Sequence, residues 1–279
     1  DLASLGGIAV KGLFLSEREG HPPPRIVETP SGMLNAIGLQ GIGVHRFIVE
    51  KLPELRRHRA VVVVNICGTT IDEYVELARV LSEAEGVAAL ELNISCPNIK
   101  EGGITFGCSL TGTHAVVSAV RKVTRLPVIP KLTPNVTDVA SFARAAEEAG
   151  ADAVSLVNTF LAMAIDVETR RPRLSNIVGG LTEPAIRPIA VRMVYECRQA
   201  VRLPIIGMGG ITTASDVLEF LIAGATAVQI GTANFVDPML WPKLLDGLTS
   251  YMNRHGIVRL SELTGTLDTT REQHASISS

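Results

Sequence analysis

The chain has 279 residues, a hydrophobic fraction of 46% and a formal net charge of −2. Such a charge gives no strong basic field for nucleic acid or a membrane surface, and no apolar run approaches the ~18 residues of a membrane-spanning helix. The cysteines form no CxxC pair and the histidines show no metal-binding spacing, so we expect no metal or iron–sulfur site in this chain. Scattered cysteines without a disulfide framework predict a cytoplasmic protein.

Short apolar runs alternate along the chain with stretches of helical period, which is typical of βα units and a parallel sheet. The runs are nearly all apolar, as expected for strands that are buried on both faces. They lie at residues 8–10, 60–65, 89–94, 128–132, 153–158, 204–208 and 227–230. Between them the spacing predicts helices that include 72–84, 141–149 and 213–223, the last with an N-terminal cap region from Thr213 to Asp216.

Seven such strands predict an α/β fold, a (βα)8 TIM barrel whose first strand is missing, because a closed parallel barrel has eight strands. No linker or low-complexity segment divides residues 1–279, so we expect a single barrel domain. The polar insertion 17–29, which contains three consecutive prolines, predicts a hairpin or loop over one barrel mouth. The polar tail, about residues 264–279, is expected to fray.

Polar residues follow the predicted strands, at the edge where a (βα)8 barrel carries its functional groups. They are Lys11, Asn65, Asn93, Cys96, Lys131, Asn158, Thr159, Gly209, Gly210, Gly231 and Thr232. A loop cap explains any one asparagine equally well, but seven polar strand ends in register predict one site. The glycines after the last two strands predict a phosphate site, because backbone N–H groups can approach an anion closely there, and tight turns alone are the alternative.

Cys96 is the strongest single candidate for catalysis. It lies just past a strand end and precedes a proline and the glycine-containing segment 100–103. A cysteine at an exposed barrel mouth can act as proton acceptor or nucleophile, whereas most cysteines are buried and inert. We assign the buried, inert role to Cys67, Cys108 and Cys197, which lack such a setting.

Lys11 and Lys131 place ammonium groups at the ends of two strands. Each alone is as well explained as a solvated surface lysine, but a barrel strand end favours a role in the site. Lys131 could form a Schiff base, as in the barrel aldolases, or stabilise an anion. Its position alone does not decide between these two roles.

Four motifs resemble the class 1 dihydroorotate dehydrogenases, and the resemblance runs from about residue 1 to about residue 260. They are ETPSGMLNAIGLQ at 28–40, NISCPN at 93–98, KLTPNV at 131–136 and IIGMGGI at 205–211. KEGG at 100–103 and AIGLQ at 36–40 look like the NAD-linked branch of that family. The resemblance implies FMN-dependent oxidation of dihydroorotate to orotate in the de novo biosynthesis of UMP, a pyrimidine.

The resemblance also implies a role for each matching residue, with Cys96 as the base that removes the C5 proton. The residues expected to bind FMN are Lys11, Gly12, Asn65, Asn93, Lys131, Val157, Glu183, Gly209, Gly210, Gly231 and Thr232. Those expected to bind dihydroorotate or orotate are Lys11, Asn35, Ala36, Ile37, Gly38, Leu39, Asn93, Asn158 and Thr159. Lys131 is expected beside the flavin pyrimidine edge, where negative charge develops on reduction.

The sequence departs from the family pattern at three places. Glu183 replaces a glycine near the flavin, within GGLTEP at 179–184, which puts that contact in doubt. Ala162 replaces a glycine after the Asn158-Thr159 pair. Third, the family's N-terminal strand, which adds a further flavin contact, is missing.

The NAD-linked branch works with a second subunit that carries FAD and an iron–sulfur cluster. This sequence has neither a dinucleotide fingerprint followed by an acidic residue nor a cysteine cluster, which fits dependence on such an electron-transfer subunit. From the resemblance we also expect a homodimer. Three alternatives remain. They are a dihydropyrimidine dehydrogenase-type flavin domain, a Schiff-base aldolase using Lys131, and an inactive degenerate barrel, which only the missing strand and Glu183 support.

Overall fold

The computed structural model describes residues 2–95 and 106–270. Its centre is a parallel sheet with the order β1-β4-β5-β6, continued by β7-β12-β13 through an isolated parallel bridge between Lys131 and Ser155. These strands are β1 (Ile8–Ala9), β4 (Val62–Ile66), β5 (Val87–Leu92), β6 (Val128–Pro130), β7 (Val154–Leu156), β12 (Ile205–Met208) and β13 (Ala227–Gln229). The seven predicted strands are therefore confirmed, and the fold is the (βα)8 TIM barrel class.

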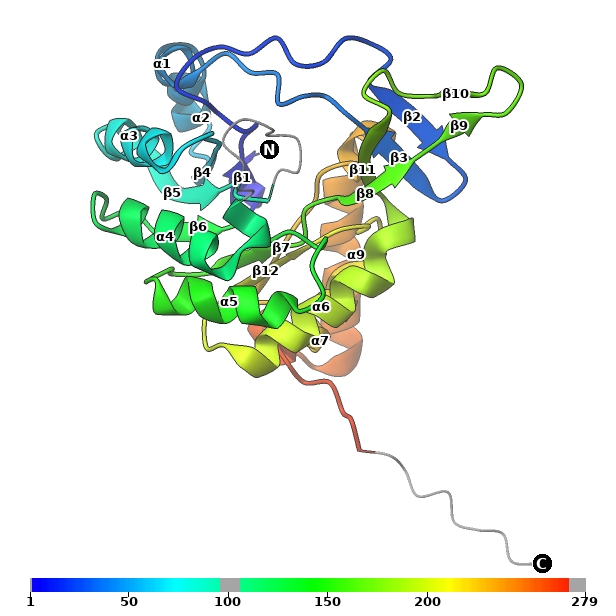
Figure 1. The fold of residues 1–279 in the computed structure, drawn as a ribbon. Coiled ribbons are helices and arrows are strands. Elements are labelled where there is room, and N and C mark those ends of the chain that lie inside the picture. The colour runs from blue at the N-terminus through cyan, green and yellow to red at the C-terminus, as the bar shows by residue number, and fades with distance from the viewer. Residues whose placement is uncertain (1, 96–105, 271–279) are drawn as a thin grey trace, which may run out of the picture.

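Helices surround these strands (Figure 1). The longer ones are α3 (Ile71–Ser82), α4 (Leu110–Arg121), α5 (Val139–Glu148), α6 (Arg187–Ala200), α7 (Ala214–Ala223) and α9 (Leu240–His255). Shorter segments are η1 (Leu2–Ser4), α1 (Val44–Arg46), η2 (Phe47–Lys51), α2 (Leu52–Arg57), η3 (Phe106–Cys108), η4 (Pro184–Ile186), α8 (Ala233–Val236) and η5 (Leu260–Leu263). The three predicted helices are confirmed, and α7 begins as predicted with a reciprocal capping box between Thr213 and Asp216.

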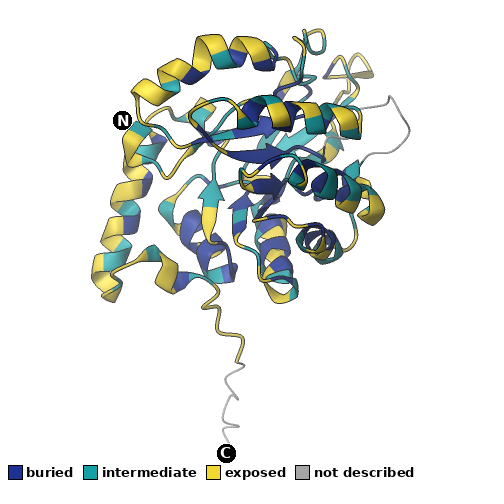
Figure 2. Ribbon diagram, turned by 90° about the vertical axis from the view of Figure 1, so that its left-hand side faces the viewer, coloured by how far each residue is buried: buried dark blue, intermediate teal, exposed yellow. Residues whose placement is uncertain are grey.

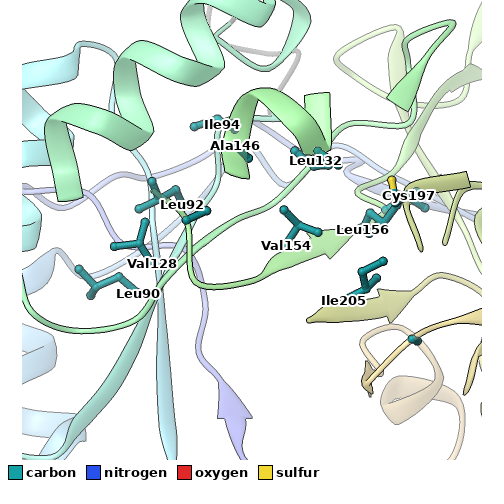
Figure 3. Packing of buried hydrophobic residues seen from close by; sticks show 14 of the residues in the cluster. Leu90, Leu92, Ile94, Val128, Leu132, Ala146, Val154, Leu156, Cys197 and Ile205 are labelled. Carbon is teal, nitrogen blue, oxygen red and sulfur yellow. The ribbon is translucent and has the colours of Figure 1, made fainter. Parts of the chain in front are cut away.

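The strands bury both faces, which explains their continuous apolar sequences. The central strands are largely buried (Figure 2). On β5, Leu90 and Leu92 are fully buried in the large cluster between sheet and helices (Figure 3). The alternate residue Ala89 belongs to a separate small cluster with Ile129 and Ala153. Because side chains alternate along a strand, Leu90 and Leu92 point toward the helices, and Ala89 and Glu91 point the opposite way, into the barrel interior.

A second, antiparallel sheet lies beside the barrel with the order β2-β3-β11-β8. Its strands are β2 (Ile26–Thr29), β3 (Gly32–Asn35), β8 (Phe160–Met163) and β11 (Val178–Thr182), and a two-stranded ribbon of β9 (Ile165–Asp166) and β10 (Arg171–Pro172) extends from it. The insertion 17–29, which was predicted to form a hairpin or loop, contains only the first strand of the observed hairpin, because β3 lies beyond it. Its partner strands between residues 160 and 182 were not predicted. A small cluster that includes Val27, Leu34 and Leu174 packs this sheet.

The expectation that the tail frays from residue 264 is wrong for its first residues. The hydroxyl of Thr264 donates to the carbonyl of Ala225 at 3.2 Å, and the amide of Gly265 donates to the carbonyl of Leu221 at 3.0 Å. These bonds hold the segment against the end of α7. Across residues 2–95 and 106–270, no helix combines the length and apolar character that crossing a membrane requires.

Candidate active site

A cavity of about 660 Å³ opens at the carboxyl ends of the parallel strands. Apart from Cys96, every residue predicted to bind cofactor or substrate lines it. These residues are Lys11, Gly12, Asn35, Ala36, Ile37, Gly38, Leu39, Asn65, Asn93, Lys131, Val157, Asn158, Thr159, Glu183, Gly209, Gly210, Gly231 and Thr232. The strand-end rule therefore located one real cavity, and the antiparallel sheet completes its wall with Asn35, Gly180 and Thr182.

Cys96, the predicted base, lies outside the described residues, as does the segment 100–103. The described chain reaches Ser95, which is buried. Of the cysteines predicted to be buried and inert, Cys67 and Cys197 are buried, and burial raises the pKa of the Cys197 thiol to about 12. Cys108 is exposed, which corrects that prediction, because η3 ends there at the surface just before α4.

A buried glutamate forms the base of the cavity. Glu91 is 1% exposed; it accepts hydrogen bonds from the side chains of Asn65 at 2.5 Å and Ser155 at 2.8 Å, and its Oε2 lies 3.8 Å from Lys131 Nζ. A buried carboxylate is tolerated only with such partners. Glu91 therefore fixes the Asn65 amide and a cationic lysine in the cavity wall. Glu91 was not predicted, although a single acid within an apolar strand is a usable signal.

The asparagines form a connected chain of hydrogen bonds above Glu91. Asn93 Nδ2 donates to Asn65 Oδ1 at 3.3 Å, Ser95 Oγ donates to Asn93 Oδ1 at 3.2 Å, and Asn158 Nδ2 donates to Ser95 Oγ at 2.6 Å. The Tyr74 hydroxyl donates to the Asn93 carbonyl at 2.8 Å and holds the strand end. Such a chain orients amides that both donate and accept, which suits a ligand with ring amides and carbonyls.

Two further asparagines hold the loops around the substrate side of the cavity. Asn135 Nδ2 donates to the Thr159 carbonyl at 3.0 Å, and its Oδ1 accepts from the Leu161 amide at 3.0 Å. Asn35 Nδ2 donates to the Gly180 carbonyl at 3.3 Å, which ties the hairpin to β11. A side chain at Gly180 would collide with the Thr159 hydroxyl, so the two walls can meet only because this residue is glycine.

The other end of the cavity is rich in glycine. Gly209 and Gly210 have φ angles of +123° and +74°, and a Cβ on Gly210 would lie 2.6 Å from the Glu183 carbonyl oxygen. Asn234 Nδ2 donates to the Gly231 carbonyl at 2.9 Å, and Trp241 Nε1 donates to Asn234 Oδ1 at 2.8 Å. Asn234 and Trp241 were missed by the sequence analysis. The exposed backbone of this end suits a phosphate.

Glu183 does not fit this pattern. Its φ of +75° and ψ of −171° fall in a region that is almost confined to glycine. Its Oε1 is buried and has no hydrogen-bond partner among the described residues, and burial raises the pKa of the carboxyl. Ala162, the other departure, is not a lining residue and packs in the Val27–Leu34 cluster of the antiparallel sheet.

A family profile described as dihydroorotate dehydrogenase matches residues 1–252. The chain is similar to proteins named dihydroorotate dehydrogenase B (NAD(+)), catalytic subunit. It is 53% identical to that of Porphyromonas gingivalis over 267 residues, which are 96% of this chain and 87% of the relative. The identity is 54% for Geotalea uraniireducens and 50% for Bacteroides thetaiotaomicron, each over 96% of this chain and 88% of the relative. The chain therefore belongs to the dihydroorotate dehydrogenase family.

Proposed function

We propose that this protein oxidises dihydroorotate to orotate in pyrimidine biosynthesis, with FMN as its cofactor and with electrons passing to NAD⁺ through a partner subunit. The observation that carries the proposal is the Glu91-centred network. It brings Lys131, Asn65, Asn93 and Asn158 into one cavity with a glycine-rich end, in a chain of this family.

The cavity fits FMN in size and in the chemistry of its donors. About 660 Å³ lies within the roughly 300–1,000 Å³ of small-ligand sites. The glycine-rich end would hold the phosphate through Gly209, Gly210, Gly231 and Thr232. The opposite end would hold the ring through Lys11, Gly12, Asn65, Asn93, Lys131 and Val157. Of the two acidic lining residues, Glu91 is paired with Lys131, whereas Glu183 has no counter-ion among the described residues and its chemistry opposes an anion.

When bound, FMN would supply the acceptor for the hydride that leaves C6 of dihydroorotate. Lys131, held by Glu91 with an Nζ–Oε2 distance of 3.8 Å, keeps a fixed positive charge in the cavity that stabilises developing negative charge. Asn93 and Asn158 present oriented amide groups to the substrate's own amides and carbonyls. Lys11 supplies a second ammonium for the substrate carboxylate.

The C5 proton of dihydroorotate is only weakly acidic, so its removal needs a positioned base. We propose Cys96 for this role, because it follows Ser95 directly and Ser95 belongs to the asparagine chain. A thiolate can accept the proton when its pKa is not far above the ambient pH. Asn35, Ala36, Ile37, Gly38, Leu39 and Thr159 complete the proposed substrate wall.

The rival functions are distinguished by chemistry. A Schiff-base aldolase needs an amine that is free to attack a carbonyl, whereas Lys131 Nζ lies 3.8 Å from Oε2 of the buried Glu91. An inactive barrel has no need of a buried polar network, which is costly unless every member is satisfied. The segment 35–40 favours dihydroorotate over dihydrouracil as the substrate.

The assembly and location are also proposals. We infer a homodimer that works in the cytoplasm with a subunit carrying FAD and an iron–sulfur cluster. The name "catalytic subunit" of the relatives supports a partner, and the lack of CxxC pairs in this sequence supports a cluster on another chain.

The test is an anaerobic titration of the purified protein, followed by visible absorbance. A yellow protein whose flavin band is bleached by dihydroorotate supports the proposal. Bleaching by dihydrouracil but not by dihydroorotate would favour the dihydropyrimidine dehydrogenase-type rival. Borohydride trapping of a carbonyl substrate on a colourless protein would favour the aldolase, and a protein that neither binds FMN nor reacts would be the inactive barrel.

A further inference from the structure

Glu183 occupies a position shaped for glycine, at the phosphate end of the cavity. Its backbone has the left-handed φ of +75°, and its carbonyl oxygen lies beside Gly210. A Cβ added to Gly32 would lie 3.4 Å from the Cβ of Glu183. Glu183 therefore lies between the β2–β3 turn, which contains Gly32, and the loop after β12, which contains Gly210. Nothing in this packing requires a carboxylate.

The described neighbours leave the Glu183 carboxyl without a counter-ion. Arg187, one helical turn further along, binds Asp216 and also contacts Glu219 Oε2 from its Nε at 3.2 Å. The packed hairpin contributes Glu28, which is exposed and of the same charge. Glu183 Oε1 is buried without any hydrogen-bond partner, and burial is the cause of its raised pKa.

The charge of the cavity therefore depends on Glu183. The charged residues that line it, among those described, are Lys11, Lys131, Glu91 and Glu183. With Glu183 ionised the two positive and two negative charges cancel, and with Glu183 protonated one positive charge remains. A phosphate monoester carries about −1.5 to −2 near neutral pH, so the protonated form attracts it and the ionised form does not.

We propose that Glu183 takes up a proton from solvent when the phosphate-bearing cofactor binds, so that the cofactor affinity of this chain falls as pH rises. The inference rests on the proposed function, because FMN is the phosphate ligand. Proton uptake removes a like charge from the cavity and converts an unpaired acceptor into an O–H group that can donate to an anion. Glu183 is thus a titratable determinant of cofactor affinity rather than a catalytic residue.

The first measurement is an FMN titration followed by quenching of flavin fluorescence. Glu183→Gln should bind FMN roughly ten-fold more tightly than the wild type at about pH 8, the scale of one like charge at intermediate dielectric, and the two should converge towards about pH 5. The FMN affinity of Glu183→Gly should depend on pH in the same way as that of Glu183→Gln. This second variant keeps the test available if the Glu183→Gln protein fails to fold. Glu28→Gln, which removes an equal charge from the adjacent hairpin, should bind as the wild type does.

The second measurement counts protons by calorimetry of FMN binding in buffers of different ionisation enthalpy. The phosphate itself titrates near about pH 6, so the calorimetry is done at about pH 8, where the free phosphate is fully ionised, and the difference between wild type and Glu183→Gln gives the proton uptake that depends on the carboxyl. The wild type should take up more protons, by as much as about one. Equal proton counts, or an affinity ratio that does not change with pH, would overturn the inference while FMN binding itself stands. Absence of FMN binding in all variants would instead overturn the proposed function, and this inference with it.

Discussion

Lys131 Nζ lies 3.8 Å from Oε2 of Glu91, a carboxylate that is 1% exposed and also accepts hydrogen bonds from Asn65 and Ser155. The alternating faces of β5 put Glu91 inside the barrel, and the Lys131–Ser155 bridge brings the ends of β6 and β7 together around it. One buried acid therefore organises side chains from β4, β6 and β7. The cavity depends on a residue that need not touch a ligand.

Replacing Glu91 tests this organisation. Glu91→Ala should lower the free energy of unfolding by about 3 kcal/mol, because it leaves the Asn65 amide and the Lys131 ammonium without their acceptor. Urea unfolding followed by circular dichroism measures the change. Glu76→Ala, which removes a half-exposed acid whose nearest cation is Arg79 at 3.7 Å, is the matched control and should change stability by less than about 0.5 kcal/mol. Equal effects of the two substitutions would contradict the role of Glu91.

Lys131→Ala should make bound FMN harder to reduce, because negative charge on the reduced cofactor loses a nearby cation. The measurement is the flavin midpoint potential by dye-coupled anaerobic titration. Lys243→Ala, which removes a surface lysine paired with Asp237, should leave the potential unchanged. An unchanged potential in Lys131→Ala would count against the proposed role.

The parallel strands were predictable because a strand buried on both faces is a continuous apolar run. The strand-end rule then located Lys11, Asn65, Asn93, Lys131, Asn158, Gly209 and Gly231, whereas residues 35–39 came from the family resemblance. Glu91 was not predicted because it lies inside such a run, where a single acidic residue only lowers the apolar character of the strand and does not by itself indicate a site. The sheet containing β8 and β11 was missed because its strands are short and follow irregular loops. Its register is set by distant partners, as in the pairing of Gly180 with Asn35.

Cys96→Ala should keep bound FMN but slow its reduction by dihydroorotate roughly 10²-fold or more, the usual contribution of a positioned base. Stopped-flow bleaching of the flavin band measures the rate. Cys108→Ala is the matched control, because Cys108 is exposed and lies outside the cavity lining. A wild-type bleaching rate in Cys96→Ala would show that Cys96 is not the base.

Gly231→Ala should weaken FMN binding by roughly ten-fold without loss of stability. A Cβ at Gly231 would meet no heavy atom within 4 Å, so the apoprotein tolerates it, but it projects from the proposed phosphate loop into ligand space. Fluorescence titration and thermal melts measure the two effects. Gly6→Ala also meets nothing within 4 Å and does not line the cavity, so it should leave both unchanged. Equal FMN affinity in the two variants would show that the phosphate does not bind beside Gly231.

Glu183→Gln should stabilise the apoprotein in a pH-dependent way. Burial raises the folded-state pKa of the carboxyl above its ordinary value of 4.5. The stability that Glu183 contributes is therefore present below that value and is lost as pH rises through the raised pKa. Thermal melts should thus coincide at about pH 4 and separate at about pH 7.5, with the glutamine variant melting higher. Glu183→Gly should add a further, pH-independent gain of about 1 kcal/mol by relieving the left-handed φ. A constant difference between Glu183→Gln and the wild type across this pH range would contradict a buried titrating carboxyl.

The purified chain should pass electrons from dihydroorotate to an artificial acceptor but poorly to NAD⁺. A dinucleotide acceptor needs its own binding site, and this sequence has no dinucleotide fingerprint followed by an acidic residue. We propose that the cavity of about 660 Å³ holds FMN and dihydroorotate. Steady-state assays with a dye and with NAD⁺, on the same preparation, give the comparison, and adding the electron-transfer subunit of a relative should raise only the NAD⁺ rate. Equal rates with dye and NAD⁺ in the isolated chain would show that no partner subunit is needed.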